Sequence, residues 1–449
     1  MAALTEPQGS TSLRCVPTHP LRQTDEGKVP MNNFKRLLAV EAASGLLCAT
    51  LASAAMAFTP WQPAVSGQGQ RVEVPEAAPS YVAHDGDPID LGTGLYVRKS
   101  IDLVLMDDVP LVFSRTYRNR DSRSRPFGIG TNHSFGSFLV GDAPAITYID
   151  LILPDGGRVH YQRTDGGTGY VGAVFEHMTS PSEYRNSRLF WDRGGWTIQL
   201  RNGSVYTYPA CAPGLNKPCT MSSYRNAAGY ELRMRHDGRM NLVQIQSNQG
   251  SRIDLTYDPL DRIVLARSST GQEVRYGYDS LGRLVQVTTS EGPSSATYGY
   301  DASHQMIQVD EPGISIKNAF DNAGRCILND VRLEVRDYRG RVTLQRLLFA
   351  FAYTVDAKGR ITATEVEGPS SRRRVSFNDQ GYVISDTVDG GGAREFGTAF
   401  EREVGSNVLQ RLTLWCGADR QTKVETTVNP ESSAEIIRRL LELACRGVR

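Results

Sequence analysis

The chain has 449 residues, and its 50 Lys and Arg against 49 Asp and Glu give a formal net charge of +1. This length exceeds one ordinary compact core and predicts two or three units. The basic side chains are dispersed along the chain, so nothing indicates a nucleic-acid-binding surface. The 43 Gly and 19 Tyr residues, with many short alternating runs, favour an all-β fold.

The N-terminal 83 residues predict export and a spacer. Residues 1–30 are polar and contain four prolines, which indicates a disordered or non-native extension with translation starting at Met31. Residues 31–57 are typical of a secretory signal peptide. Residues 58–83 are rich in Pro, Gly and Gln and predict an extended linker.

The signal peptide is predicted from three features in order. A short basic segment precedes an apolar stretch that ends in a small-x-small site, which places cleavage between Ala57 and Phe58. The alternative is an uncleaved membrane anchor, since the stretch approaches the minimum spanning length, although it contains Glu41. We therefore expect a secreted, periplasmic or envelope-associated protein, in contact with a membrane only through this segment.

Residues 84–230 predict an antiparallel β domain. Runs such as 151–161 and 191–200 alternate around Gly turns and predict hairpins. Its motif stretches are 86–94, 111–118 and 127–135. The residues that stand out in them are Gly86, Asp87, Pro88, Asp90, Gly94, Arg115, Tyr117, Arg118 and His133.

Two cysteines of this domain flank a Pro- and Gly-rich loop. Because export into an oxidising space permits disulfides, we expect Cys211 and Cys219 to be bonded. The alternative is zinc binding, but further Cys or His ligands are not found nearby in the sequence.

A degenerate repeat of about twenty residues fills residues 231–400. Its clearest copy is Tyr278–Thr288, and we take the Arg-equivalent positions to be 239, 262, 283, 305 and 325, in steps of 23, 21, 22 and 20. A fixed period of this size predicts a stacked or spiralling architecture, in which each unit buries its face against the next.

Each unit predicts one β-hairpin. Residues 273–278 alternate as a strand, Asp279 can accept backbone amides two residues on, and Gly282 can adopt the left-handed conformation that closes the turn. The strand then returns with apolar residues at 285 and 287. Since a catalytic group is not needed in every unit, we expect structural roles for the repeated residues. They are Tyr257, Asp258, Arg262, Tyr278, Asp279, Gly282, Arg283, Tyr300, Asp301, Asp321, Gly324, Arg325, Gly359 and Arg360.

The tail, residues 401–449, predicts a short amphipathic helix. Asn429 suits the cap, Pro430 suits the first helical position, and an apolar face follows. We expect this helix to pack on the sheet of its own chain.

The pattern Tyr-Asp-x-x-Gly-Arg-Leu resembles the YD repeats of bacterial RHS (rearrangement hotspot) proteins. The three stretches between 86 and 135 resemble the domain of unknown function that precedes those repeats, with Asn132 where an aromatic residue is common. The resemblance covers about residues 84–395 and implies an N-terminal β domain followed by a spiralling array of hairpins, part of an RHS shell. Full-length RHS proteins resemble hollow shells that enclose a toxin and release it by aspartyl self-cleavage. Because the sequence lacks the Asp-Pro-x-Gly signature of that core, we expect a short form without toxin or autoproteolytic activity.

The sequence contains no recognisable catalytic motif. A Gly-x-Ser-x-Gly elbow, a His-Glu-x-x-His motif and a phosphate-binding Gly-Lys-Ser loop are all missing. The acidic cluster 84–90 does not have the spacing of a calcium loop, and no nucleophile can be assigned to His133. We therefore expect a non-enzymatic protein without cofactor or metal.

The leading hypothesis is a scaffold that contacts carbohydrate or another cell-surface or secreted protein, with Tyr96, Tyr161 and Tyr170 as candidates for stacking on sugars. The alternatives are a truncated remnant of a polymorphic toxin system and a cell-wall hydrolase without a recognisable motif. A partial spiral has unpaired sheet edges, so self-association or a protein partner is also expected.

Overall fold

The computed structural model describes residues 84–85, 88–142, 145–178, 182–211, 219–290, 295–336, 340–389, 395–416 and 422–427. Contacts divide the chain into two units, 1–56 and 57–449, and all described residues belong to the second. Predictions for the N-terminal extension, the signal peptide with Ala57 and Phe58, the linker, Gly86, Asp87 and the C-terminal helix lie outside the described residues. Among those described, no helix is long and apolar enough to cross a membrane.

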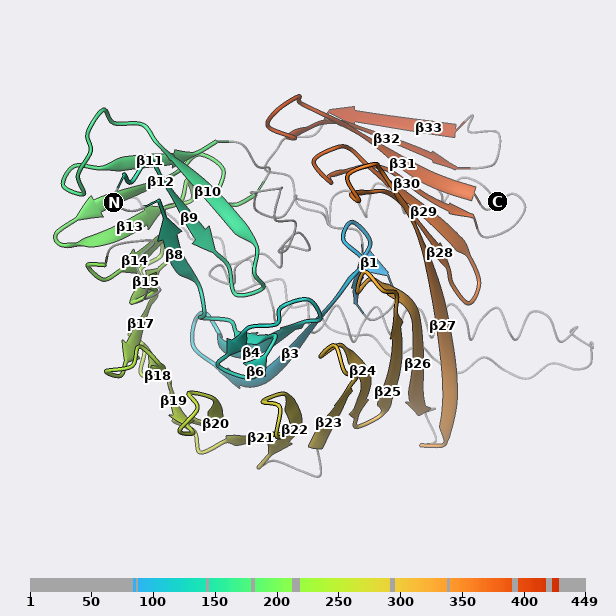
Figure 1. The fold of residues 1–449 in the computed structure, drawn as a ribbon, viewed down its shortest axis with the longest axis horizontal. Coiled ribbons are helices and arrows are strands. Elements are labelled where there is room, and N and C mark those ends of the chain that lie inside the picture. The colour runs from blue at the N-terminus through green and yellow to red at the C-terminus, as the bar shows by residue number, and fades with distance from the viewer. Residues whose placement is uncertain are drawn as a thin grey trace, which may run out of the picture. The chain divides into compact units, whose positions relative to one another are not determined.

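The regular elements of the described residues are all β-strands, and every pairing is antiparallel (Figure 1), which confirms the all-β prediction. An N-terminal sheet has the order β1-β2-β3-β4-β7, and a separate pair is formed by β5 and β6. These strands are β1 (His84–Asp85), β2 (Ile89–Asp90), β3 (Leu95–Leu105), β4 (Leu111–Arg118), β5 (Ser124–Arg125), β6 (Gly128–Ile129) and β7 (Thr131–His133).

A second, much longer ladder begins at β8. Its first turn closes on itself, because β14 pairs with β16 while β15 pairs back with β8. The strands of this turn are β8 (Phe138–Gly141), β9 (Tyr148–Ile152), β10 (Arg158–Arg163), β11 (Val174–His177), β12 (Ser187–Asp192), β13 (Gly195–Gln199), β14 (Val205–Tyr208), β15 (Cys219–Thr220) and β16 (Ser223–Arg225).

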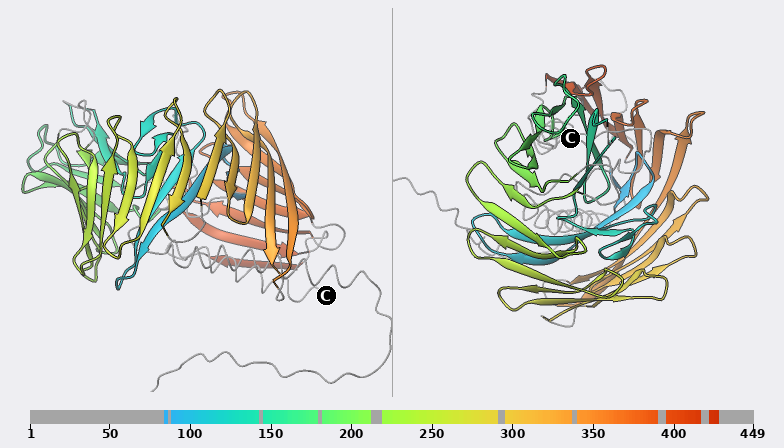
Figure 2. Two further views of the ribbon diagram at one scale, coloured as in Figure 1. Left: turned by 90° about the horizontal axis from the view of Figure 1, so that it is seen from below. Right: turned by 60° about the vertical axis from the view of Figure 1, so that its left-hand side comes forward.

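The ladder continues as successive hairpins, which Figure 2 shows as one continuous series of strands. They are β17 (Glu231–His236), β18 (Leu242–Ser247), β19 (Arg252–Tyr257), β20 (Ile263–Ser268), β21 (Glu273–Tyr278), β22 (Leu284–Thr289), β23 (Ser295–Tyr300), β24 (Met306–Glu311), β25 (Ile314–Phe320), β26 (Cys326–Arg336), β27 (Val342–Val355), β28 (Ile361–Glu367), β29 (Arg372–Phe377), β30 (Val383–Asp389), β31 (Glu395–Arg402), β32 (Leu409–Cys416) and β33 (Thr422–Thr427).

The structure draws the internal boundaries differently from the sequence. The predicted domain 84–230 is split, because β1–β7 form the small sheets whereas β8–β16 belong to the ladder of the repeats. The ladder also passes residue 400, so β32 and β33 lie in what was predicted to be the tail.

A β-bulge recurs where each returning strand begins. Tyr278 pairs with Leu284, while Gly277 pairs with Gln286, so the register shifts by one residue at Val285. The bulge interrupts strict alternation, and Leu284 and Val287 are buried while Val285 is only half-buried. Val285, one of the two apolar residues noted in the returning strand, therefore does not share the buried face with Leu284 and Val287.

Candidate functional site

The Asp of each repeat organises its own turn. The Oδ1 atom of Asp279 accepts the backbone N–H groups of Leu281 (3.0 Å) and Arg283 (2.9 Å), and Oδ2 accepts Nε of Arg283 at 2.7 Å. Gly282 has φ +81°, the left-handed value that the turn needs. Partial burial alone would raise the pKa of Asp279, but the backbone amides and the Arg283 guanidinium lower it. The same contacts recur in the pairs Asp258–Arg262, Asp321–Arg325 and Asp356–Arg360.

The Arg and the Tyr of neighbouring repeats connect one turn to the next. The Arg283 guanidinium lies over the Tyr300 ring, 5.2 Å from its centroid, and the Tyr300 hydroxyl donates to the Leu284 carbonyl at 2.8 Å. Arg262 lies over Tyr278 in the same way at 4.5 Å. The chemistry of the motif is therefore used within the fold, between one unit and the next.

Three repeats depart from the motif as it was assigned from sequence. After Asp237 the fourth position is Asn241, whose amide donates to Asp237 and to Asp261, so Arg239 is not the Arg-equivalent residue. After Asp301 the fourth residue is Gln305, whose backbone N–H still bonds to Asp301.

The third departure concerns the aromatic residue. Arg325 lies over Tyr353, 5.3 Å from its centroid, and the Tyr353 hydroxyl donates to the Cys326 carbonyl. Tyr353 stands three residues before Asp356, not directly before it, so the motif search missed it. An aromatic residue two places earlier in the same strand was the available signal.

The N-terminal segment contacts the turns of successive repeats along a line that we call the docking seam. The Pro126 carbonyl accepts the N–H of Ile263 at 2.7 Å, and the N–H of Ile129 donates to the Gly282 carbonyl at 3.0 Å. The Tyr117 hydroxyl donates to the His304 carbonyl (2.9 Å) and accepts the N–H of Met306 (2.8 Å).

The docking seam continues to the next two repeats. Asn119 Nδ2 donates to the Gly324 carbonyl at 2.7 Å, and the Cys326 N–H donates to the Gly94 carbonyl at 2.8 Å. Further along, the Thr364 hydroxyl donates to the Leu91 carbonyl at 2.6 Å. At the repeat turns of this seam, backbone groups of the repeats therefore receive partners from the N-terminal segment, and at Thr364 on β28 a side-chain hydroxyl makes the contact instead.

Glycine is required at two points of close approach in the docking seam. Gly94 has φ +70°, and a Cβ there would lie 2.7 Å from the Cβ of Arg325. At Gly128, with φ +81°, a Cβ would lie 2.2 Å from the Gly282 carbonyl oxygen. Any larger residue would push the segment away from the repeat turns.

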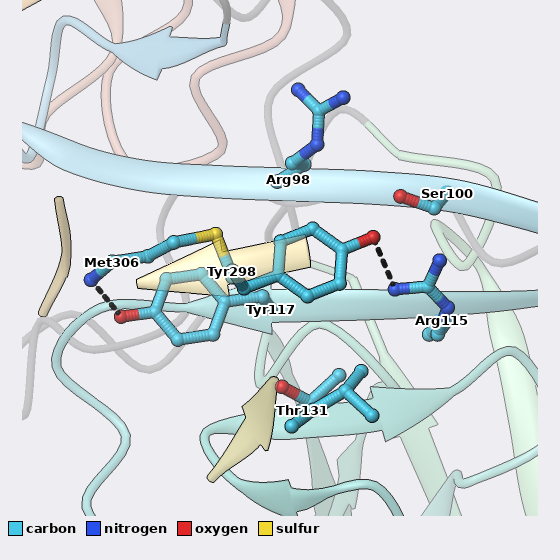
Figure 3. Close-up of a pocket in the computed structure, with 8 residues that line it drawn as sticks. Arg98, Ser100, Arg115, Tyr117, Thr131, Tyr298 and Met306 are labelled. Atoms are coloured by element: carbon cyan, nitrogen blue, oxygen red, sulfur yellow. Dashed lines mark hydrogen bonds between the residues drawn. The ribbon is translucent and has the colours of Figure 1, made fainter. Parts of the chain in front are cut away.

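A buried polar network, shown in part in Figure 3, crosses the same interface. Arg115 on β4 donates through Nε to both carboxylate oxygens of Asp102 on β3, at 2.9 Å each, and through Nη1 to the Tyr298 hydroxyl at 3.0 Å. The Tyr276 hydroxyl also donates to Asp102, at 2.8 Å. Burial raises the pKa of Asp102, against the lowering effect of Arg115.

The network extends to the rim of a small pocket. The Tyr298 hydroxyl donates to Glu311 at 3.2 Å, and Glu311 pairs with Arg98 at 2.7 Å. The pocket beside this network is lined by Arg98, Arg115 and Tyr298 and has room for about one water molecule. The network connects the N-terminal sheet to the ladder of the repeats.

The remaining N-terminal motif residues are also held by local contacts. The Asp90 carboxylate accepts the N–H of Gly92 and the hydroxyl of Thr93, and the Pro88 carbonyl accepts the N–H of Val97. Arg118 is buried, which lowers its pKa, and its N–H donates to the Gly130 carbonyl.

His133 is a buried structural histidine in this arrangement. Its Nδ1 accepts the N–H of Phe135 at 3.2 Å, and its ring stacks on Phe113 at 6.1 Å between centroids. Burial lowers its pKa to about 3, which keeps the ring neutral. Beside it, Asn132 accepts the N–H of His133 and donates to the Pro154 carbonyl.

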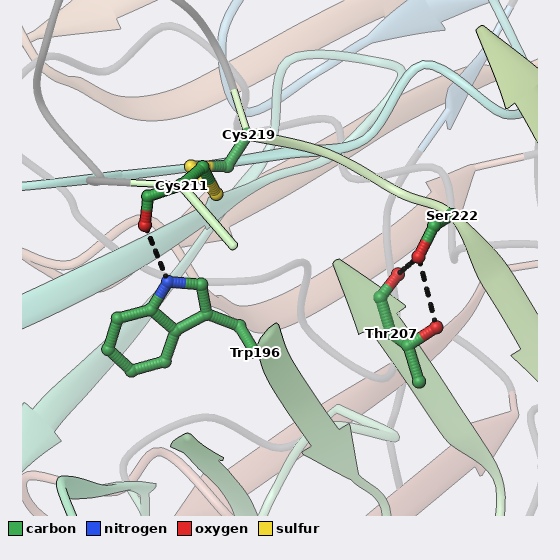
Figure 4. Close-up of a disulfide and its surroundings, with 5 residues drawn as sticks. All are labelled: Trp196, Thr207, Cys211, Cys219 and Ser222. Atoms are coloured by element: carbon green, nitrogen blue, oxygen red, sulfur yellow. Dashed lines mark hydrogen bonds between the residues drawn. A yellow bond between two sulfur atoms is a disulfide. The ribbon is translucent and has the colours of Figure 1, made fainter. Parts of the chain in front are cut away.

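Cys211 and Cys219 are joined by a disulfide (Figure 4). The indole of Trp196 donates to the Cys211 carbonyl at 3.1 Å, so the bridge is also tied to β13. Cys326, the free cysteine among the described residues, is buried, and burial raises its pKa to about 12.

The candidates for stacking on sugars are placed unequally. Tyr96 and Tyr161 are fully buried, so these two proposed residues were wrong. Tyr170 is half-buried and stacks on Trp191, with ring centroids 5.6 Å apart and an interplanar angle of 25°. Trp191 is itself half-buried and was not singled out from the sequence.

Among the residues that the structure describes, no group of three or more His, Cys, Asp or Glu side chains is placed to hold a metal ion. His160 Nδ1 lies 2.7 Å from Asp150, its cross-strand partner, and this hydrogen bond raises the pKa of His160. The same carboxylate, which is buried, also pairs with the half-buried Arg158 at 3.1 Å, so Asp150 is neutralised by two partners.

Comparison with known proteins places two parts of the sequence. Residues 86–161 match a domain of unknown function (DUF6531), and residues 257–294 and 278–313 match the RHS Repeat. A comparison with curated proteins found no match.

A comparison with solved structures matched the Tc holotoxin pore of Photorhabdus luminescens with a mutated TccC3. The identity is 11% and the TM-score 0.29, over 78% of this chain and 23% of that one. The TcdB2-TccC3-TEV structure is similar at 11% identity and a TM-score of 0.28, over 78% and 24% of the two chains. The present chain thus spans about a quarter of the length of these proteins.

Proposed function

Because this chain belongs to the RHS-repeat proteins, we propose that it is a non-catalytic β-repeat scaffold, exported to the cell envelope or beyond, that contacts carbohydrate on a surface. The observation that carries the scaffold role is the internal use of the motif chemistry. The repeated Asp, Arg and Tyr side chains bond to their own turns and to neighbouring repeats, and the N-terminal motif bonds to the repeat turns.

The disulfide supports export. A bond between Cys211 and Cys219 forms and persists in an oxidising compartment, in agreement with the signal peptide predicted from the sequence. A retained cytoplasmic location would leave this bridge reduced.

The pair of Tyr170 and Trp191 supports carbohydrate contact. Both rings are half-buried, and Tyr170 follows a loop in which Arg163 donates to the Gly169 carbonyl at 2.9 Å. Next to Trp191, the Asp192 and Arg193 side chains are 53% and 94% exposed. Flat rings with adjacent polar groups suit the apolar faces and hydroxyls of a pyranose.

The test is binding of the purified chain to a glycan panel and to purified wall polysaccharide. Tyr170→Ala should weaken binding at least tenfold, whereas Tyr148→Ala, a half-buried tyrosine on β9 that contacts His160, should leave it unchanged. Wall turbidity should not fall during incubation, and a fall would point to the hydrolase alternative. If no glycan binds, a fragment of a larger toxin-delivery shell becomes the better reading, and resequencing the DNA beyond the codon for Arg449 would test it.

A further inference from the structure

One hairpin of the ladder is much longer than the others. Strands β26 and β27 have 11 and 14 residues, whereas β17–β24 have six each. Their pairing runs without interruption from Leu328↔Ala350 to Arg336↔Val342. Figure 1 shows β26 and β27 side by side as long strands of the ladder. None of the contacts of the docking seam reaches the turn end of this hairpin.

The turn end carries apolar side chains in water. Leu344 is 74% exposed, Val342 is 47% exposed and Val335 is 39% exposed. Such a concentration of exposed aliphatic groups on one protruding element is unusual on a soluble surface and marks a site of interaction. Single exposed aliphatic residues also occur at other turns, such as Leu260 and Leu281, but Val342 and Leu344 lie two residues apart on one strand.

The same end of the hairpin is basic. The described residues 330–336 and 340–346 contain four Arg (332, 336, 341 and 346) against Asp330 and Glu334, a net charge of +2. Asp330 pairs with Arg346 at 2.8 Å and with Arg332 at 3.6 Å. Arg336 has no ion-pair partner among the residues that the structure describes.

Val342 and Leu344 lie on one face with the paired arginines, whereas Val335, opposite Thr343, lies on the other face. Arg332 pairs with Arg346, Glu334 with Leu344 and Arg336 with Val342. Directly paired residues project to the same side of a sheet, and so do residues two apart along a strand. One face of the hairpin end thus presents Val342 and Leu344 together with Arg332, Arg336, Arg346 and Glu334, and we call this set the hairpin face.

We propose that the hairpin face binds the surface of an anionic phospholipid membrane. Val342 and Leu344 would enter the boundary between headgroups and acyl chains. The arginines would remain among the phosphates, because the aliphatic part of each side chain is long enough for the guanidinium group to stay hydrated at the level of the headgroups. Attraction of basic residues to anionic lipid adds to the apolar contribution. This membrane contact is separate from the carbohydrate contact proposed above, which lies on β10–β12 and the loop between β10 and β11.

The test is co-sedimentation of the purified chain with vesicles of phosphatidylglycerol and phosphatidylcholine, compared with phosphatidylcholine alone. Binding is expected only to the anionic vesicles and should weaken as salt is added. Arg336→Gln should lower the partition coefficient about fivefold, as expected for one basic residue near the surface. Val342→Asp should lower it at least tenfold.

The matched control is Val404→Asp, because Val404 is 99% exposed in another turn. Circular dichroism of each variant should match that of the parent chain. The proposal is overturned if the parent chain ignores anionic vesicles, or if the changes at 342 and 404 have equal effects. Binding to an acidic protein without binding to vesicles would also overturn it.

Discussion

The sequence itself provides a control for the contribution of the repeat ion pair. Asp279 and Asp301 each stabilise a turn of the same kind by accepting two backbone N–H groups. The distances are 3.0 and 2.9 Å at Asp279 and 2.9 and 2.8 Å at Asp301. Only Asp279 has an Arg four residues on, whereas Asp301 has Gln305. Replacing each Asp by Asn keeps an oxygen for the amides, so the difference between the two variants isolates the ion pair.

The expected magnitude follows from the exposure of the pair. The Arg283 and Asp279 side chains are 14% and 23% exposed, between a buried pair and a fully solvated one. A hydrogen bond to a charged group contributes about 1.5–3 kcal/mol, and an exposed ion pair about 0–1 kcal/mol. We expect Asp279→Asn to lower the free energy of unfolding by about 1–2 kcal/mol and Asp301→Asn by about 0.5 kcal/mol.

The assay is urea unfolding monitored by circular dichroism, with the slope against denaturant checked for constancy so that midpoints can be compared. Equal losses for the two variants would refute the reasoning, because they would show that turn formation alone accounts for the Asp. A larger loss at Asp301 would do the same.

Three further predictions concern other parts of the fold. Burial lowers the pKa of His133 to about 3, so below pH 6.5 the unfolded chain binds a proton that the folded chain does not. The free energy of unfolding therefore decreases as the pH is lowered, by up to about 1.4 kcal/mol per pH unit. In urea titrations at a series of pH values, His133→Asn should remove about 2 kcal/mol of the loss between pH 7 and pH 5. Replacing Cys211 and Cys219 together by Ser should cost about 2–3 kcal/mol and abolish the effect of reductant on the unfolding midpoint, whereas a midpoint still sensitive to reductant would contradict this. Asp102→Asn should lower the free energy of unfolding by about 3 kcal/mol or more, because Arg115 is then buried without its carboxylate. A second change, Arg115→Met, should restore part of this stability. If the double variant is no more stable than Asp102→Asn alone, the ion pair does not have the role given to it here.

The sequence predicts the repeats well because their determinants are local. Asp279, Gly282 and Arg283 act within five residues, and the all-β fold follows from them. The bulge opposite Tyr278 was not predicted, because an inserted residue leaves the hydrophobic pattern looking like simple alternation. Asn241 was missed for a related reason, since a nearby Arg239 offered a better match to the motif than the residue that occupies the position.

The contacts of the candidate site were beyond sequence reasoning because they are remote. Tyr117 and His304 are 187 residues apart, and nothing in either local pattern indicates the other. The burial of Tyr96 and Tyr161 likewise follows from the packing of one sheet on another, which the alternation within a strand does not reveal. Tyr353 shows that the ladder tolerates a change in where the aromatic ring originates, provided that it reaches the preceding arginine.

The docking seam also implies an order of assembly during synthesis. Residues 91–129 leave the ribosome before the repeat residues that they contact, and the separations between partners are 187 residues at His304, 205 at Gly324 and 273 at Thr364. At 5–20 residues per second, a repeat of about twenty residues takes about one to four seconds to emerge, whereas a hairpin forms in microseconds. Each turn therefore meets a completed template as it appears, with one short loop to close. A chain diluted from denaturant has no docked repeat to begin from, so each of these contacts must then close a loop of up to about 270 residues.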